Sequence, residues 1–338
     1  MAQRGLLHRI AIRAEAWVDR VRPRRRPEAP VLDAYRGYAV PGGVVLRGRV
    51  LGSLRRTTPD PEQSRWQNAR EMISLFLSDE VAGVTVLAPD HGVAVQSDEE
   101  GYVTLEVPVT GAPPGWYDVP LEIEGQPDSR KMFRAMIPSP QARLGVISDI
   151  DDTMMQTGAY SLLRNLWTTF TGSAETRRIF PDAIVLMDWL TNHGRNPVFY
   201  VSSSPWNLHA FLERVFDRAG LATGPMFLRD LGISETQFIS GTHGDHKGSA
   251  IDRIMAANPG LDFVLLGDTG QHDAEVYLEA THRHGGRVRA VALREPGPGP
   301  DDASRAAIAA LKRQGVKVVH DRDFSAAADR LSAAGLAP

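Results

Sequence analysis

The C-terminal part of the chain is predicted to form an α/β fold built on a doubly wound parallel sheet. After Pro140, short apolar stretches alternate with segments of helix-forming composition, which is typical of parallel sheets covered by helices. The apolar stretches carry few polar residues, as expected for strands that are buried on both faces. Before Pro140, short segments rich in β-branched residues are separated by turn-forming residues, and this pattern predicts a small all-β part of the sandwich type.

The length and composition of the chain set the expected number of domains and exclude some functions. A chain of 338 residues exceeds one typical core, so more than one domain is expected. We expect a basic amphipathic helix and linker at 1–30, a β-sandwich-like domain at 31–140 and an α/β domain at 141–338. The net charge of −3 gives no field that would attract nucleic acid.

The chain contains no cysteine, which excludes disulfides, thiolate zinc sites and a cysteine nucleophile. A metal ion would therefore need carboxylate, carbonyl, hydroxyl or imidazole ligands. No stretch approaches the roughly 18 apolar residues that a membrane-spanning helix requires. These features predict a cytoplasmic protein that is attached to a membrane at most peripherally.

Residues 1–26 predict an amphipathic helix with a basic face. Apolar residues recur at helical spacing, and arginines occupy the opposite face and the segment that follows. Such a helix can lie on an anionic membrane surface. The alternative is a helix packed on its own protein and followed by a solvated basic linker. Most amphipathic helices pack in this way. Both interpretations stay open.

Residues 31–140 are expected to form short antiparallel strands and one helix, near 62–77. Turn-forming sequences such as PGG, DEEG and GAPPG separate the strands. The expected strands are 44–51, 83–88, 93–97, 102–109, 117–124 and 131–137. We find no group of catalytic residues in this part of the sequence.

In the α/β part, expected strands alternate with expected helices. The strands are 144–148, 197–201, 263–267, 287–293 and 316–319, and the helices include 181–194, 205–220, 247–258 and 272–284. Ser204 is expected to cap the second of these helices. Ligands of such sheets bind beyond the carboxyl ends of the strands, so the chemistry is expected just after the first three strands.

Three carboxylates follow the first strand of the α/β part. Asp149, Asp151 and Asp152 repel one another unless a cation neutralises them, and a hard divalent ion with oxygen ligands suits such a group. The alternative is an acidic loop that only caps the following helix.

Polar residues also follow the second and third strands. Ser202, Ser203 and Ser204 offer hydroxyls and loop amides to a phosphate, unless they serve only to cap a helix. Asp268 and Asp273 lie five positions apart and can complete a cation site, although Asp273 is also placed to cap the next helix.

Lys247 is predicted to open a helix, where its charge is unfavourable to the helix dipole. A bound phosphate would explain this lysine better than helix stability does, and the alternative is a solvated side chain. Taken together, these signals at neighbouring strand ends predict one phosphoryl-transfer site.

The order of these motifs resembles that of the haloacid dehalogenase (HAD) superfamily of phosphotransferases. Within it, SDIDDT, YVSSSPWNL, HKGSAI and LLGDTGQHD closely resemble the actin-patch-protein type of phosphatidate phosphatase, whose catalytic domain is related to that of the lipins. The resemblance covers about residues 144–293. It implies a HAD-like fold and a Mg²⁺-dependent phosphatase that acts through an aspartyl-phosphate on phosphatidate, giving diacylglycerol, or on a related lipid phosphate.

The resemblance also implies catalytic and phosphate-binding roles. Asp149 is implied to be the nucleophile, and Asp151 the acid that protonates the leaving oxygen and then deprotonates water. Ser202 and Ser203 are implied to bind the phosphoryl oxygens, and Lys247 to neutralise the nucleophile and the phosphate.

The same resemblance implies a Mg²⁺ site formed by Asp149, Asp268 and the Asp151 backbone carbonyl, with Asp273 in support. The physics agrees, because a carboxylate that attacks a phosphate dianion is repelled unless positive charge offsets the repulsion.

Two features outside these motifs are candidate substrate contacts. The stretch 154–180 is long enough for an extra helical segment, in which Trp167 would offer apolar surface to acyl chains as part of a lid. The alternative is ordinary core packing. Arg294, at the end of the strand 287–293, is placed to reach a substrate headgroup.

The predicted function is therefore a phosphatase, with the substrate left open. A lipid phosphate is the first hypothesis and a soluble phosphomonoester is the second, because the fold does not settle the substrate. A third hypothesis is a non-catalytic module that senses phosphate or serves as a membrane adaptor. The intact set of Asp149, Asp151, Lys247 and Asp268 speaks against the third hypothesis.

Overall fold

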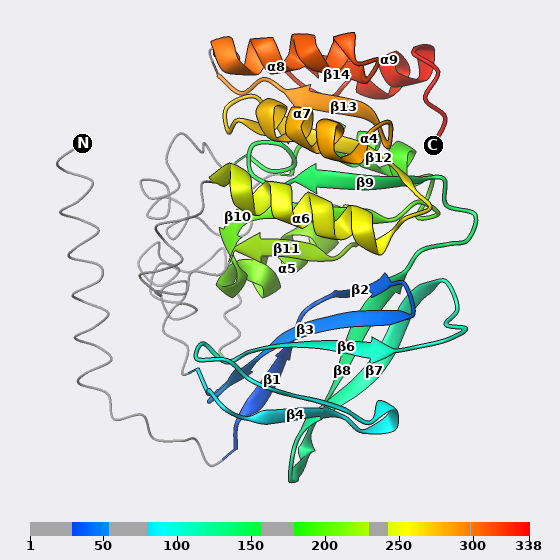
Figure 1. The fold of residues 1–338 in the computed structure, drawn as a ribbon. Coiled ribbons are helices and arrows are strands. Elements are labelled where there is room, and N and C mark those ends of the chain that lie inside the picture. The colour runs from blue at the N-terminus through cyan, green and yellow to red at the C-terminus, as the bar shows by residue number, and fades with distance from the viewer. Residues whose placement is uncertain (1–28, 54–79, 157–178, 230–242, 298) are drawn as a thin grey trace, which may run out of the picture.

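The computed structural model describes residues 29–53, 80–156, 179–229, 243–297 and 299–338 (Figure 1). Within these ranges the chain forms two sheets, one of them before and the other after residue 140. The helices predicted at 1–30 and near 62–77, and most of the stretch predicted as a lid, lie outside the described residues. No helix in the described part of the chain is long and apolar enough to cross a membrane.

The first sheet contains eight strands, which are joined mainly by antiparallel pairs; β2 and β8 are parallel. Its strands are β1 (Val31–Ala34), β2 (Gly37–Val40), β3 (Gly43–Leu51), β4 (Thr85–Ala88), β5 (Val93–Gln96), β6 (Tyr102–Pro108), β7 (Gly115–Ile123) and β8 (Gln126–Ile137). Strands β1 and β2 were not predicted. They are four residues long, too short to show a clear alternation of apolar and polar residues.

The all-β sheet, meaning strands β1 to β8, folds over on itself around a shared core. Leu46 on β3 and Leu105 on β6 belong to the same buried cluster as Leu121 on β7 and Phe133 on β8. A Cβ atom at Gly48 would lie 2.6 Å from the Phe133 ring, so glycine is needed for this close approach.

The second sheet is the predicted parallel sheet. Its six strands lie in the order β11-β10-β9-β12-β13-β14, and each neighbouring pair is parallel. The strands are β9 (Leu144–Asp149), β10 (Val198–Pro205), β11 (Met226–Arg229), β12 (Asp262–Asp268), β13 (Val288–Arg294) and β14 (Lys317–Asp321). The short strand β11 was not predicted.

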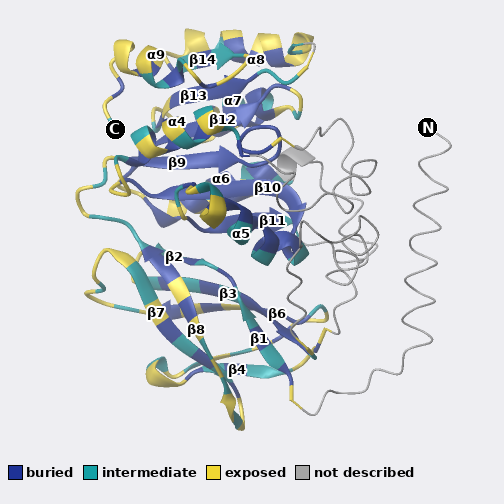
Figure 2. Ribbon diagram, turned by 180° about the vertical axis from the view of Figure 1, so that it is seen from behind, coloured by how far each residue is buried: buried dark blue, intermediate teal, exposed yellow. Residues whose placement is uncertain are grey.

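Helices cover both faces of the parallel sheet, and the strands between them are buried (Figure 2). The helices are α4 (Pro181–Thr191), α5 (His209–Ala219), α6 (His243–Ala257), α7 (Asp273–His284), α8 (Asp302–Arg313) and α9 (Ala327–Ala333). Successive residues of β9 alternate between the two faces. Val146 packs in the cluster that includes α4, α5 and α9, and Ile147 packs in the cluster that includes α6, α7 and α8.

Two predicted helix starts were wrong. Strand β10 continues to Pro205 and is followed by a 3₁₀ turn, η2 (Trp206–Leu208), so α5 begins at His209 and Ser204 does not cap it. Helix α6 begins at His243, which places Lys247 in the second turn rather than at the start of the helix. The unfavourable interaction of Lys247 with the helix dipole is therefore weaker than the sequence indicated.

Candidate functional site

The predicted site residues meet at the carboxyl edge of the parallel sheet. Strand β9 ends at Asp149 and β12 ends at Asp268, and the parallel register places Val201 of β10 beside Asp149. The serines that follow Val201 and the acidic residues that follow β9 therefore come to the same edge. As expected for an open α/β sheet, this is where buried polar side chains gather.

Lys247 lies at the centre of the buried charges. Its Nζ atom is 2.7 Å from Asp149 Oδ1 and 2.5 Å from Asp273 Oδ1. Lys247 is 4% exposed, Asp149 1% and Asp273 0%, so water screens these ion pairs little. Burial by itself would lower the pKa of Lys247, but Asp149 and Asp273 outweigh burial and raise this pKa above its usual value.

Asp149, Asp268 and Asp273 form a group of carboxylates suited to a divalent cation. One oxygen from each lies within 4.8 Å of the others. Among the described residues, Asp149 Oδ2 and Asp268 Oδ2 have no hydrogen-bond partner although both are buried. Carboxylate oxygens without donors are the ligands that a hard ion such as Mg²⁺ prefers, so these residues fit the predicted metal.

The pKa values of two of these carboxyls reflect the same need for positive charge. Burial, reinforced by Asp273 and Asp268, raises the pKa of Asp149 well above its usual range despite the nearby Lys247. Burial and then Asp273 raise the pKa of Asp268 to about 8, against the opposing effect of Lys247. A cation bound here would favour the ionised form of both groups.

Asp273 is held by residues that sequence reasoning missed. Its Oδ2 atom accepts a hydrogen bond of 3.0 Å from the Asp268 N–H. A Cβ atom at Gly267 would lie 2.5 Å from that same oxygen, so only glycine leaves room for it. The Tyr277 hydroxyl donates to the Leu266 carbonyl oxygen at 2.7 Å and fixes α7 against β12. The glycine directly before Asp268 was the available sequence signal.

Asp151 is not part of the carboxylate group around Lys247. Its Oδ2 atom accepts hydrogen bonds from the hydroxyls of Ser202 at 2.8 Å and Ser204 at 3.0 Å. The backbone N–H of Ser204 donates to the Ser202 hydroxyl oxygen at 2.9 Å. Gln271, a further residue that sequence reasoning missed, donates to the Asp151 backbone carbonyl at 2.9 Å. This carbonyl, predicted as a metal ligand, keeps a second lone pair.

Ser203 lies between these two serines and is buried. Asp152 takes a left-handed conformation with φ of 56°, which Asp tolerates better than most residues. The backbone then turns so that the N–H groups of Met154 and Met155 both donate to the Ile150 carbonyl. This tight turn carries the chain away from the sheet after the acidic motif.

Arg294 is paired within the protein. Its Nε donates to the Thr153 carbonyl at 3.1 Å, and its Nη2 donates to Asp182 Oδ2 at 2.8 Å. The guanidinium carbon also lies 4.0 Å from the ring centroid of Phe180 and 4.5 Å from that of Phe324. Arg294 is buried, so this arrangement favours support of the turn after Asp151 over the predicted substrate contact. Trp167 lies outside the described residues.

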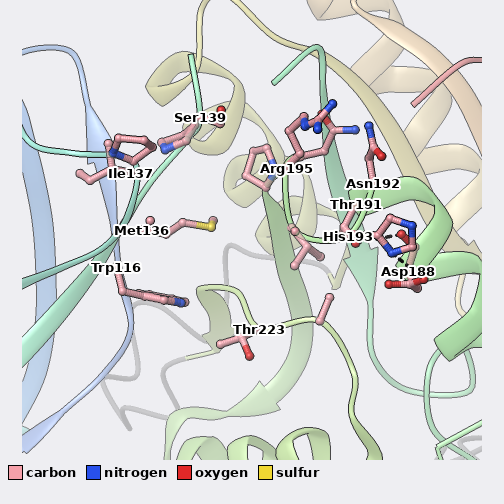
Figure 3. Close-up of a pocket in the computed structure, with 18 of the residues that line it drawn as sticks. Trp116, Met136, Ile137, Ser139, Asp188, Thr191, Asn192, His193, Arg195 and Thr223 are labelled. Atoms are coloured by element: carbon pink, nitrogen blue, oxygen red, sulfur yellow. Dashed lines mark hydrogen bonds and ion pairs between the residues drawn. The ribbon is translucent and has the colours of Figure 1, made fainter. Parts of the chain in front are cut away.

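A separate pocket of about 700 Å³ lies between the two sheets (Figure 3). Trp116 and Met136 come from the all-β sheet, and Arg195 and Thr223 precede β10 and β11. The pocket is therefore at the amino ends of the parallel strands, on the side away from the acidic residues. It contains none of the predicted catalytic residues.

Comparison with known proteins matched the segment that contains the predicted site residues. Residues 144–295 match the family described as the catalytic domain of the phosphatidate phosphatase APP1. A curated relative, phosphatidate phosphatase APP1 of Saccharomyces cerevisiae, is 27% identical over 257 residues, which is 74% of this chain. Residues 144–295 thus resemble the APP1 catalytic domain. It spans 40% of the length of the yeast protein.

A solved structure was also found to resemble part of this chain. It is described provisionally as a β-phosphoglucomutase from Thermotoga maritima, with 10% identity and a TM-score of 0.35. The match covers 56% of this chain and 98% of the other. A similarity of this size supports no further argument. The matched segment ends at residue 295 and contains all of the predicted site residues.

Proposed function

We propose that the protein is a Mg²⁺-dependent phosphatase of HAD-like fold that converts phosphatidate to diacylglycerol through an aspartyl-phosphate. The observation that carries this proposal is the buried Lys247 shared by Asp149 and Asp273, beside Asp268, within the segment that matches the APP1 catalytic domain. One buried cation among three carboxylates leaves negative charge that a metal ion would balance.

In the proposed first step, Asp149 attacks the phosphorus of the substrate. A bond forms between a carboxylate oxygen of Asp149 and phosphorus while the bond from phosphorus to the ester oxygen breaks, and Asp151 gives its proton to that oxygen. In the second step Asp151 takes a proton from water, whose oxygen attacks phosphorus and releases inorganic phosphate and free Asp149. Splitting the displacement in this way makes each barrier smaller.

Positive charge is needed because a carboxylate and a phosphate dianion repel each other. Lys247 already lies against Asp149 and offsets part of that repulsion. Asp149, Asp268 and the Asp151 carbonyl would hold Mg²⁺, supported by Asp273, and the bound ion would neutralise charge on the phosphoryl oxygens.

The serines at the end of β10 are proposed to bind the phosphoryl group. Ser202 donates to Asp151 in this structure. Because a hydroxyl group can rotate, Ser202 could donate instead to a phosphoryl oxygen of a bound substrate. Ser203 is proposed to assist it. Ser204 would keep Asp151 oriented when Ser202 turns to the substrate, because both hydroxyls contact the same carboxylate oxygen.

The proposal includes contact with a membrane surface, because phosphatidate is a lipid. Residues 1–26, which lie outside the described part of the chain, are proposed to bind anionic lipid and to hold a cytoplasmic enzyme there. Deletion of these residues should weaken sedimentation with anionic liposomes. Unchanged sedimentation would return the segment to an internal packing role.

The central experiment offers the purified protein phosphatidate in mixed micelles and, separately, a panel of soluble phosphomonoesters, all with Mg²⁺. Phosphate release from phosphatidate is expected, and release from the soluble esters alone would replace the lipid proposal by the soluble-substrate alternative. Asp149→Asn should abolish turnover and the Mg²⁺-dependent phosphoenzyme. Asp128→Asn, at an exposed hairpin residue, is the matched control and should retain both.

A further inference from the structure

The strand end that carries the predicted phosphate-binding serines is not held by a continuous sheet ladder. Strand β10 pairs with β9 only as far as Val201, opposite Asp149. Its register with β11 is interrupted between Val201 and Pro205. Ser202–Ser204 lie beyond the residues that pair with β9 and within the interrupted register with β11. Their position therefore depends on side-chain contacts and on the residues that follow them.

Trp206 directly follows this strand end, and residues of the all-β part pack against its indole ring. The indole is 4% exposed. Its ring stacks on Tyr35 with a centroid distance of 4.7 Å and an interplanar angle of 17°. The guanidinium carbon of Arg47 lies 4.6 Å from the indole centroid. Tyr35 follows β1 and Arg47 belongs to β3, and the Tyr35 N–H donates to the Arg47 carbonyl at 3.0 Å. The two residues are thus fixed relative to each other.

Further contacts make this junction part of the protein core. Tyr35 and Tyr102 belong to the same buried cluster as Trp206 and the helices of the α/β part. Arg36 forms ion pairs with Glu213 at 2.8 Å and Asp217 at 3.3 Å, both on α5. Figure 1 shows the all-β sheet beside α5 and β11. Because the stacked rings of Tyr35 and Trp206 are buried, the junction restricts the movement of η2.

We infer that the all-β sheet positions the phosphate-binding strand end, with Tyr35 and Arg47 acting as positioning residues through Trp206. The inference rests on the proposed function of Ser202. A shift of about 1 Å in a residue that places substrate lowers activity by about 10²-fold. Asp149 and Asp268 end strands whose ladders reach the adjacent residues, so they do not depend on Trp206.

The test compares three variants of the full chain. Tyr35→Leu keeps an apolar side chain but removes the stacked ring, and Tyr35→Phe restores the ring. Leu121→Ala removes buried volume from the core of the all-β sheet, in a cluster separate from Trp206. Calorimetric titrations measure the affinity for inorganic phosphate in saturating Mg²⁺ and, separately, the affinity for Mg²⁺. Steady-state assays with phosphatidate give kcat and KM.

Tyr35→Leu should weaken phosphate binding about tenfold and lower kcat/KM for phosphatidate by at least as much, with unchanged Mg²⁺ affinity. Tyr35→Phe should restore both values. Leu121→Ala should lower the unfolding midpoint but leave phosphate affinity at the wild-type value. The inference is overturned if Tyr35→Leu binds phosphate normally, if it loses Mg²⁺ affinity in parallel, or if Leu121→Ala shows the same loss.

Failure of the proposed function gives a different result. A wild-type protein that binds phosphate and Mg²⁺ but hydrolyses no ester would refute the proposed function, while the phosphate affinities of the variants would still decide the inference. A wild-type protein that binds no phosphate would refute both.

Discussion

Replacement of Lys247 by Met tests the electrostatic balance of the site most directly. The substitution keeps a long unbranched side chain and removes the cation that lies 2.7 Å from Asp149 and 2.5 Å from Asp273. Both carboxylates are almost completely buried, so water cannot replace the lost charge. Removal of one partner from a buried ion pair typically costs about 3–5 kcal/mol in unfolding free energy.

This loss is a large fraction of a typical folding free energy of about 5–15 kcal/mol. With a slope of about 3 kcal/mol per molar urea, it should lower the urea midpoint by about 1–1.7 M. The measurement is urea unfolding followed by circular dichroism, in EDTA. Lys312→Met, at an exposed residue of α8, is the matched control and should shift the midpoint little.

Two further measurements separate charge from packing in this prediction. Mg²⁺ at 100 times its dissociation constant should stabilise Lys247→Met by about 2.7 kcal/mol, because the ion binds only the folded carboxylate group. Adding Asp273→Asn should recover part of the loss, since one unpaired charge is removed. If Lys247→Met in EDTA unfolds at the same urea concentration as the Lys312→Met control, the reasoning about buried charge is refuted.

Three other predictions concern residues around the site. Gly267→Ala places a methyl group 2.5 Å from Asp273 Oδ2. It should lower the free energy of unfolding by about 1–3 kcal/mol, measured by thermal unfolding, and weaken Mg²⁺ binding, measured by calorimetry. The control is Gly260→Ala, whose added methyl group meets no atom within 4 Å and should have neither effect. Burial, reinforced by a nearby arginine, lowers the pKa of His209 from 6.5 to about 3. As the pH falls below 6.5, the His209 imidazole therefore takes up a proton in the unfolded chain but not in the folded protein. The contribution of His209 to stability should therefore be constant above about pH 6.5 and fall below it, by about 1.4 kcal/mol at pH 5.5. Urea midpoints of His209→Gln should lack that part of the fall. Arg294→Met removes a donor to the turn after the predicted nucleophile, and we expect a lower kcat with little change in KM in the phosphatidate assay; a raised KM alone would instead indicate a substrate contact.

The sequence was enough to predict the chemistry and the edge of the sheet at which the candidate residues meet. Buried strands that alternate with helices can form only a few architectures, and in a parallel sheet the carboxyl ends of the strands share an edge. Asp149, Ser202 and Asp268 each follow such a strand, so their meeting was predictable without coordinates. The spacing of Asp273 after Asp268 was equally visible, as was the order of motifs shared with the APP1 family.

Only the tertiary structure decided how these residues are partnered. Sequence periodicity describes one element at a time, and it gives no information on contacts between residues far apart in the chain. It therefore could not show that Arg294 pairs with Asp182, or that Tyr35 of the all-β sheet stacks on Trp206. Local propensity also placed a helix start at Ser204, where the contact of its hydroxyl with Asp151 and the continuing strand prevail. Side-chain packing and hydrogen bonds between residues far apart in the chain thus determine which of the predicted polar residues contact one another.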